Sequence, residues 1–154
     1  MIKKGCAMAA VVVLGVFGAY LYLLWGKVEA VPAIIANVRA SGFLVEDIGT
    51  ILVTHEHNDH VGGVAGLQQA SGARVLARAV AAEALEAGRS DGRDPQFEET
   101  GACRPVKNVS TLVDGEDVTL GTLKFRHLPN TGHTAGGYGR CWAGAGISMY
   151  RGSR

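Results

Sequence analysis

The sequence has little excess charge of either sign. Lysine and arginine total 15 residues and aspartate and glutamate total 14, which gives a formal net charge of +1 at pH 7. A nucleic-acid-binding domain normally presents a strongly basic face or stripe, so nucleic acid is not an expected partner. No internal repeat is visible. No glycine recurs at every third position, which excludes a collagen-like fibre.

Cysteine is also scarce. The three cysteines, Cys6, Cys103 and Cys141, are far apart in the sequence, and none of them forms a C-x-x-C pair. So few and so widely spaced cysteines exclude a disulfide scaffold. A single bridge between Cys103 and Cys141 remains open as an alternative.

Hydrophobic residues, in contrast, are plentiful. They make up 47% of the 154 residues, against 19% for charged residues, so the chain is not expected to be disordered. Its length is sufficient for one domain with a single core. Glycine is frequent as well, with 22 residues that cluster near the histidines. This clustering indicates tight turns around a site.

Residues 1–30 have the pattern of a segment that precedes the folded domain. Lys3 and Lys4 come before a run from Ala7 to Trp25 that contains neither a charge nor a proline. As a helix, this run would nearly span the roughly 30 Å hydrocarbon core of a membrane. A basic flank followed by an apolar run is typical of a signal peptide or an N-terminal membrane anchor. Either interpretation places the rest of the chain outside the cytoplasm; a buried core helix is the third alternative.

After this segment, helical and strand patterns alternate, which predicts an α/β fold. Apolar residues at helical spacing predict helices over residues 32–40, 64–70 and 79–87. Apolar and β-branched runs predict strands over residues 48–54, 74–77, 111–113, 117–120 and 123–128. The remaining long segments are predicted to be a polar loop at 89–108, a glycine-rich loop at 129–139 and an irregular tail at 140–154.

Four potential metal ligands lie directly after the strand predicted at residues 48–54. They are His55, His57, Asp59 and His60. Alternate residues of an extended backbone point the same way, so His55 and His57 can converge on one ion. Asp59 and His60 then lie around a turn, where they can bind a second ion. Imidazole nitrogen and carboxylate oxygen together favour zinc, with iron as an alternative.

At these residues a family resemblance becomes visible. The segment T-H-E-H-N-D-H-V-G-G, from Thr54 to Gly63, resembles the H-x-H-x-D-H signature of the metallo-β-lactamase superfamily. A second segment, T-G-H-T-A-G-G from Thr131 to Gly137, resembles the one that brings the family's third histidine to the metal. Within the superfamily the sequence is most similar to the third subclass of class B β-lactamases, because His60 stands where other subclasses have arginine. Glyoxalase II enzymes and lactonases share the same core motif.

The resemblance implies a set of ligands and a reaction. His55, His57 and His133 would hold a first zinc ion, and Asp59 and His60 would hold a second. Asp59 would also orient the attacking water, which makes it the expected catalytic residue. A zinc-bound hydroxide would then open the amide of a small-molecule β-lactam, in the periplasm or on a membrane anchor that faces it. The alternatives are hydrolysis of a thioester or a lactone, metal binding without turnover, and a chain that does not fold.

The sequence also departs from the family pattern at both ends of the matching region, which covers roughly residues 31–137. Complete members form a four-layer αβ/βα sandwich of two halves, so the resemblance implies about one half behind an N-terminal hydrophobic helix. The family's opening strands are not found before Pro32, and no histidine follows His133 as the last zinc ligand. Cys141 is the alternative for that ligand.

These departures predict a chain that is truncated at both ends. The expected segments are a signal peptide or anchor at 1–30, an incomplete metallo-β-lactamase-like domain at 31–139 and an irregular tail at 140–154. With an incomplete second site, the chain is expected to bind fewer than two zinc ions and to be weakly active or inactive. The oligomeric state stays open.

Other residues near the motifs are expected to lie outside the site. His127, on a predicted strand, is expected to face solvent. Glu56 alternates away from the ligand histidines and is expected to face a loop or solvent. The charged residues between positions 83 and 99 are expected to form a solvated face. Thr134 is expected either to cap the next element or to hydrogen-bond a ligand histidine.

Overall fold

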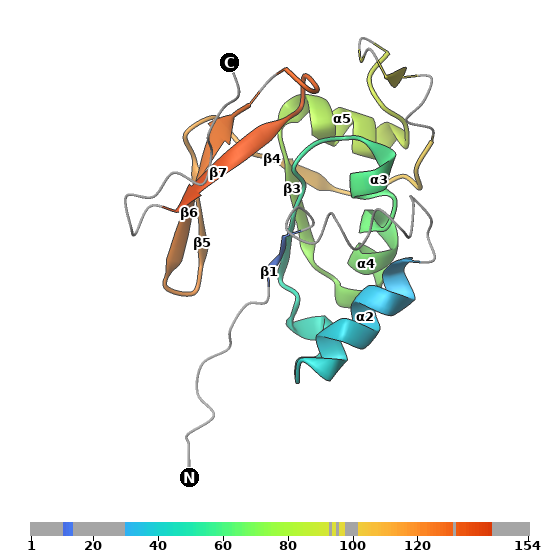
Figure 1. Ribbon diagram of the computed structural model, residues 1–154, viewed down its shortest axis with the longest axis vertical. Helices are drawn as coiled ribbons and strands as arrows, with labels where there is room; N and C mark the ends of the chain where they lie inside the picture. Colours follow the sequence, from blue (N-terminus) through green and yellow to red (C-terminus); the bar gives the residue numbers. More distant parts are fainter. Residues whose placement is uncertain are drawn as a thin grey trace.

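A computed structural model of the chain describes residues 11–13, 30–92, 94, 96–97, 102–130 and 132–142. These residues form two β-sheets and a set of short helices (Figure 1). The first sheet is parallel, and its strands in spatial order are β1 (Val11–Val13), β2 (Thr50–Leu52), β3 (Arg74–Ala77) and β4 (Val109–Thr111). The second sheet is antiparallel, and its strands are β5 (Asp117–Leu120), β6 (Leu123–Pro129) and β7 (Tyr138–Trp142).

The helices lie in the connections between the parallel strands, as crossover connections require. They are α2 (Ala30–Ala40), the short 3-10 helix η2 (Val45–Asp47), α3 (Asn58–Val61), α4 (Val64–Ser71) and α5 (Ala79–Ala87). In Figure 1 these helices lie on one side of the parallel sheet, and the antiparallel sheet lies on the other. The α/β fold predicted from the sequence is therefore confirmed.

Strands β2 and β3 are covered on both faces, which explains why their sequences are almost continuously apolar. Ile51, Val53 and Val75 belong to a large buried cluster that also contains residues of α4 and α5. Leu52 and Leu76 alternate with them and belong to a smaller cluster with residues of β5 and β6. The carboxyl end of β2 is thus fixed between two packed layers.

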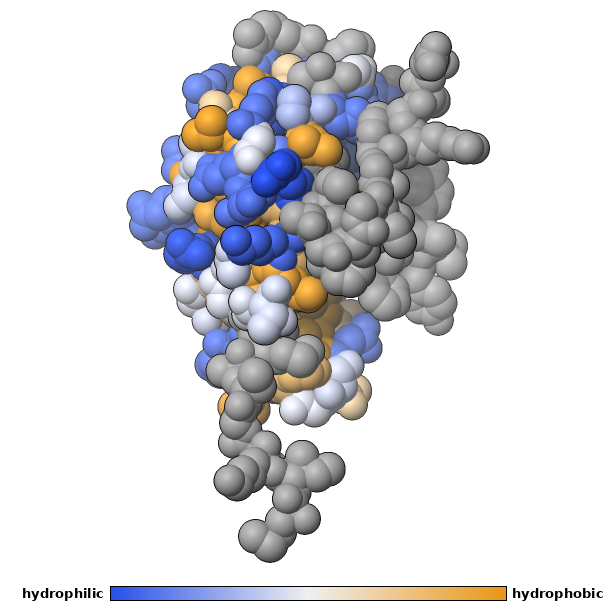
Figure 2. Space-filling view, turned by 90° about the vertical axis from the view of Figure 1, so that its left-hand side faces the viewer, coloured by the Kyte–Doolittle hydropathy of each residue, from blue (hydrophilic) through white to orange (hydrophobic). Residues whose placement is uncertain are grey.

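The antiparallel sheet has a polar outer face. In β5 the buried Val118 and Leu120 alternate with the exposed Asp117 and Thr119. Asp117 is paired with Arg126 of β6, whose Nε lies 2.9 Å from the Asp117 Oδ1. Figure 2 shows hydrophilic side chains over much of the coloured part of this side of the molecule, with smaller hydrophobic patches among them. The period-two alternation therefore places the apolar face of the sheet against the parallel sheet.

Most of the predicted elements are present. The strand at 74–77 and the helix at 79–87 have the predicted bounds. The strand predicted at 48–54 is limited to Thr50–Leu52, because the parallel ladder with β3 covers only these residues. Helix α2 begins at Ala30, before the predicted start at Pro32.

Two predictions about the outer parts of the chain are corrected. Val11–Val13 form β1, paired with β2, so these three residues are not helical, and β-branched valines suit a strand. The rest of the hydrophobic segment lies outside the described residues; none of the described helices is long and apolar enough to cross a membrane. Residues 140–142, predicted to be irregular, belong to β7 because β6 offers them a free edge for pairing. Residues 143–154 lie outside the described part of the chain.

The buried faces of the parallel sheet give a first prediction. Val75 is 0% exposed on an interior strand, so Val75→Ala leaves a cavity and should lower the free energy of unfolding by about 2 kcal/mol. Val113→Ala is the same change at a side chain that is 68% exposed. It should alter the free energy of unfolding by less than about 0.5 kcal/mol. Urea denaturation followed by circular dichroism measures both values. Equal effects of the two substitutions would contradict the packing described here.

Candidate metal centre

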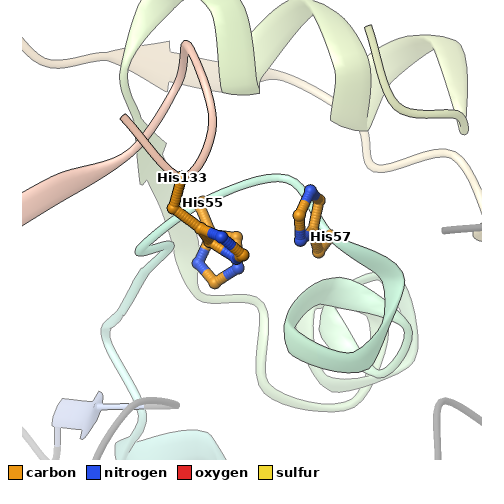
Figure 3. A group of neighbouring side chains, drawn as sticks. All are labelled: His55, His57 and His133. Atoms are coloured by element: carbon orange, nitrogen blue, oxygen red, sulfur yellow. The ribbon is translucent and has the colours of Figure 1, made fainter. Parts of the chain in front are cut away.

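The candidate site lies where the carboxyl end of β2 meets the loop between β6 and β7. His55 and His57 follow β2, and α3 begins directly after His57. His133 lies in the loop between β6 and β7. Figure 3 shows the three imidazole rings close together, carried by these two segments of the chain. The structure thus brings together the side chains that the resemblance assigned to the first ion, although their role as ligands stays a prediction.

The three side chains are close enough to share one ion. One potential ligand atom from each histidine lies within 4.8 Å of those of the other two. The centroid of the His55 ring is 4.9 Å from the ring centroids of both His57 and His133, and the latter two centroids are 4.6 Å apart. Three imidazole nitrogens are a ligand set that zinc takes in proteins, usually with a fourth position left open.

Burial and the neighbouring rings keep His55 uncharged. Burial lowers the pKa of His55 to about 3, with smaller contributions from His60, His57 and His133. Burial also lowers the pKa of His60, against the opposing effect of the Asp59 carboxylate. A neutral imidazole keeps a nitrogen lone pair free, which is the form that binds a metal.

The buried nitrogens of these rings fit a bound metal. Nδ1 of His55 lies 3.2 Å from the Thr54 hydroxyl oxygen, whereas its Nε2 is buried without a hydrogen-bond partner among the described residues. Nδ1 of His60 is in the same situation within the described part of the chain. A buried nitrogen without a partner costs about 1–3 kcal/mol. Coordination of a divalent metal ion would remove the cost of leaving such a nitrogen unbonded. These residues therefore fit a metal site.

Asp94 contacts His57, and no sequence pattern indicated this contact. Both side chains are buried, and the Asp94 Oδ2 lies 2.6 Å from the His57 Nε2. Because Asp94 occupies Nε2, the other ring nitrogen of His57, Nδ1, is available to a metal. A carboxylate behind a ligand histidine fixes the orientation and tautomer of the ring. The prediction of a solvated face between positions 83 and 99 is wrong at Asp94, which is 8% exposed. Asp94 is 37 residues from His57 in the sequence, and only the fold brings the two together.

Glu56 is also buried, so of the two alternatives predicted for it, a loop or solvent, the structure confirms the loop and excludes solvent. It is 2% exposed, and its carboxylate accepts hydrogen bonds from the Thr134 hydroxyl at 2.9 Å and the Gly136 N–H at 3.3 Å. The alternation correctly predicted that Glu56 points away from the ligand histidines. That side, however, faces the loop that contains His133. Thr134 therefore bonds a buried carboxylate rather than a ligand histidine.

Asp59 and His60 lie beside the three histidines, on α3. The ring centroid of His60 is 4.0 Å from that of His55. Oδ2 of Asp59 is 3.6 Å from the His60 Nε2, and the Asp59 side chain is 53% exposed. Their assignment to a second ion stays a prediction.

One further expectation is corrected, and one open alternative is excluded. His127 is only 2% exposed, because it lies on the same inward face of β6 as Phe125, and its Nε2 is 3.8 Å from the Asp114 Oδ1. Cys103 is a free thiol, so the Cys103–Cys141 bridge is not formed. Cys141 lies on β7, but its side chain is outside the described part of the structure. Its role as an alternative last zinc ligand stays a prediction.

Comparison with known proteins adds a family match and curated relatives. The family model described as "Metallo-beta-lactamase superfamily" matches residues 15–140. A hydroxyacylglutathione hydrolase of Pseudomonas paraeruginosa is 37% identical over 111 residues, which are 68% of this chain and 40% of that protein. A protein of the same name from Rhodopseudomonas palustris is 34% identical over 106 residues, covering 69% of this chain and 32% of the relative.

Solved structures of similar fold are also known. The Rm3 metallo-beta-lactamase matches with a TM-score of 0.72 and 39% identity, over 76% of this chain and 44% of that one. MEM-A1, a subclass B3 metallo-beta-lactamase from a soil metagenome library, matches with a TM-score of 0.72 and 41% identity, with the same coverage. The chain thus spans less than half the length of these solved structures and of the two curated relatives.

The contact between Asp94 and His57 gives a second prediction. Asp94→Asn should weaken zinc binding by about 10- to 100-fold, because a neutral amide fixes the ligand ring less strongly than a carboxylate does. Competition with a chromophoric chelator measures this affinity. Asp117→Asn, which changes an exposed carboxylate of the antiparallel sheet, is the matched control and should bind zinc like the unmodified chain. If Asp94→Asn also binds like the unmodified chain, Asp94 does not support the site.

Proposed function

The chain belongs to the metallo-β-lactamase superfamily, and from this premise we propose that it acts as a zinc-dependent hydrolase that opens the amide bond of a β-lactam. The observation that carries this proposal is the convergence of His55, His57 and His133. The similarity to two solved metallo-beta-lactamases, of which MEM-A1 is of subclass B3, supports a β-lactam as the substrate.

His55, His57 and His133 are the residues that we assign to the first zinc ion. Nε2 of His55 and Nδ1 of His57 are the nitrogens left available by their neighbours Thr54 and Asp94. A zinc ion held there would supply Lewis acidity, which polarises a carbonyl and lowers the pKa of a water molecule to near 7. Because all three side chains offer neutral nitrogen atoms rather than anions, they would leave the positive charge of the ion largely uncompensated.

Asp59 is the residue that we assign to the attacking water. Its carboxylate is exposed on α3, next to His60, where water and a small molecule can reach it. A carboxylate in this place can accept a hydrogen bond from water and orient the oxygen toward a carbonyl carbon. As the new C–O bond forms and the amide C–N bond breaks, Asp59 can hold the water proton and pass it to the leaving nitrogen. His60 is the neighbour that would restrain the Asp59 side chain and share in a second metal site.

A second candidate is hydrolysis of a glutathione thioester. It is favoured by the curated relatives, which are named hydroxyacylglutathione hydrolases. The same ligand histidines and the same Asp59 would serve both reactions, because both begin with attack of water on a carbonyl carbon. The leaving group would be a thiolate instead of an amine, so direct comparison of substrates separates the two candidates.

Metal content gives a third prediction. The full chain, purified without chelator, should contain fewer than two zinc ions per molecule, because three histidines form one converging group in the described part of the chain. His133→Ala should lower this content, since it removes one of the three nitrogens. Elemental analysis by mass spectrometry measures it, with Asp117→Ala as the control that should retain the metal. A chain without metal, or an unchanged content in His133→Ala, would contradict the assignment.

Substrate selection gives a fourth prediction. The zinc-loaded full chain should hydrolyse a chromogenic cephalosporin faster than an S-acylglutathione thioester or a lactone. Asp59→Asn should lower kcat by about 10²- to 10⁴-fold on the preferred substrate, as expected for loss of a proton-transfer group. A preference for the thioester would favour the second candidate. Metal binding without turnover of any of the three substrates would contradict both candidates.

A further inference from the structure

The side chain of Glu56 joins the two segments that supply the histidines. In the sequence Glu56 lies between His55 and His57, and its carboxylate contacts the loop that follows His133. The geometry points to Glu56 as a positioning residue for His133, which holds the loop so that the third imidazole meets the other two. This inference rests on the proposed function in one respect, because it takes His133 to be a metal ligand.

Two hydrogen bonds carry the inference. The Thr134 hydroxyl donates to the Glu56 Oε2 at 2.9 Å, and the Gly136 N–H donates to the Glu56 Oε1 at 3.3 Å. Both donors come from the residues directly after His133. Glu56 is 2% exposed, and a buried carboxylate is stable only where donors replace the lost water. The loop therefore cannot move away without breaking both of these hydrogen bonds.

Close packing at Gly136 supports the same role. A Cβ atom at this position would collide with the Glu56 carboxylate and would lie 2.9 Å from both the backbone nitrogen and the Cβ of Ala81, on α5. Only glycine lets the backbone approach this closely. The loop is thus confined between Glu56 and the first turn of α5.

The guanidinium of Arg78 contacts the other residues of this loop. Its Nη1 lies 3.1 Å from the carbonyl oxygen of Ala135 and 3.5 Å from that of Gly137. Residues 134 and 136 therefore donate to Glu56, whereas the carbonyl groups of residues 135 and 137 accept from Arg78. With both groups of partners in place, the backbone conformation after His133 is fixed.

This restraint has a consequence for the metal ligands. His55 and His57 are buried, whereas His133 is an exposed residue. Packing therefore holds the first two rings, but the position of His133 depends much more on its backbone. Loss of the Glu56 contacts should accordingly affect metal binding through His133 and not through the other two ligands.

Two substitutions of Glu56 separate this role from packing and from charge. Glu56→Leu keeps a similar size but offers no acceptor to Gly136, so it should weaken zinc binding by about tenfold or more. Glu56→Gln can accept from the Gly136 N–H and donate to the Thr134 hydroxyl, so it should remain within about threefold of the unmodified chain. Chelator competition on the full chain measures affinity, and the absorption spectrum of bound Co²⁺ reports ligand geometry. Glu83→Leu, at an exposed position of α5, is the control that should bind normally.

A double-mutant comparison tests whether Glu56 acts through His133. In a His133→Ala background, Glu56→Leu should cause no further loss of zinc affinity, because the ligand that it positions is already absent. The same loss in both backgrounds would overturn the inference, since it would show an effect on the other ligands or on the whole fold. Normal binding by Glu56→Leu in the unmodified background would overturn it as well.

A second pair of variants and a second measurement keep the inference testable. If circular dichroism shows that Glu56→Leu does not fold, Thr134→Val should still weaken zinc binding, whereas Thr134→Ser should bind zinc like the unmodified chain. Equal binding by the two Thr134 variants would overturn the inference.

If the unmodified chain binds no metal, the proposed function fails. The hydrogen bond itself is then tested by amide exchange at Gly136, which Glu56→Leu or Thr134→Val should accelerate. Unchanged exchange would overturn the positioning role independently of the metal.

Discussion

The close approach of three imidazole rings at the end of β2 is the constraint on which the rest of the site depends. Rings with centroids 4.6–4.9 Å apart would repel one another strongly if they were protonated. Burial and these neighbours lower the pKa of His55 to about 3, which keeps the ring neutral. Contacts with other residues help to hold the three histidines in place. Thr54 contacts His55, Asp94 contacts His57, and the loop held by Glu56 carries His133.

The fold supplies these contacts by packing β2 on both faces. Ile51 and Val53 face the helical layer, and Leu52 faces the antiparallel sheet. This double burial leaves the carboxyl end of β2 little freedom, so the loop that follows it starts from a fixed point. Functional side chains are commonly found on loops that a rigid scaffold positions in this way.

Local sequence patterns predicted the elements and the ligand motif, whereas contacts between distant segments could not be predicted. The bounds of β3 and α5 follow from the apolar spacing of their own residues. The H-x-H-x-D-H spacing likewise predicted a ligand motif from His55 to His60, and the structure brings two of its residues, His55 and His57, together with His133. Asp94 and Glu56 differ, because their partners lie 37 and 78 residues away in the sequence, and charged residues are expected to be exposed unless a partner is known. The strands β1 and β7 were missed for a related reason, since their pairing depends on the edges that β2 and β6 present.

The division of the histidines between two sheets links metal availability to the stability of the domain. His55 and His57 follow a strand of the parallel sheet, and His133 belongs to a loop of the antiparallel sheet. An ion bound to all three would bind only the state in which the sheets are packed together, so its binding free energy would add to that of folding. At a free concentration of about 100 times Kd, this contribution is about 2.7 kcal/mol. The melting temperature of the domain would therefore rise and fall with the free zinc concentration around the protein.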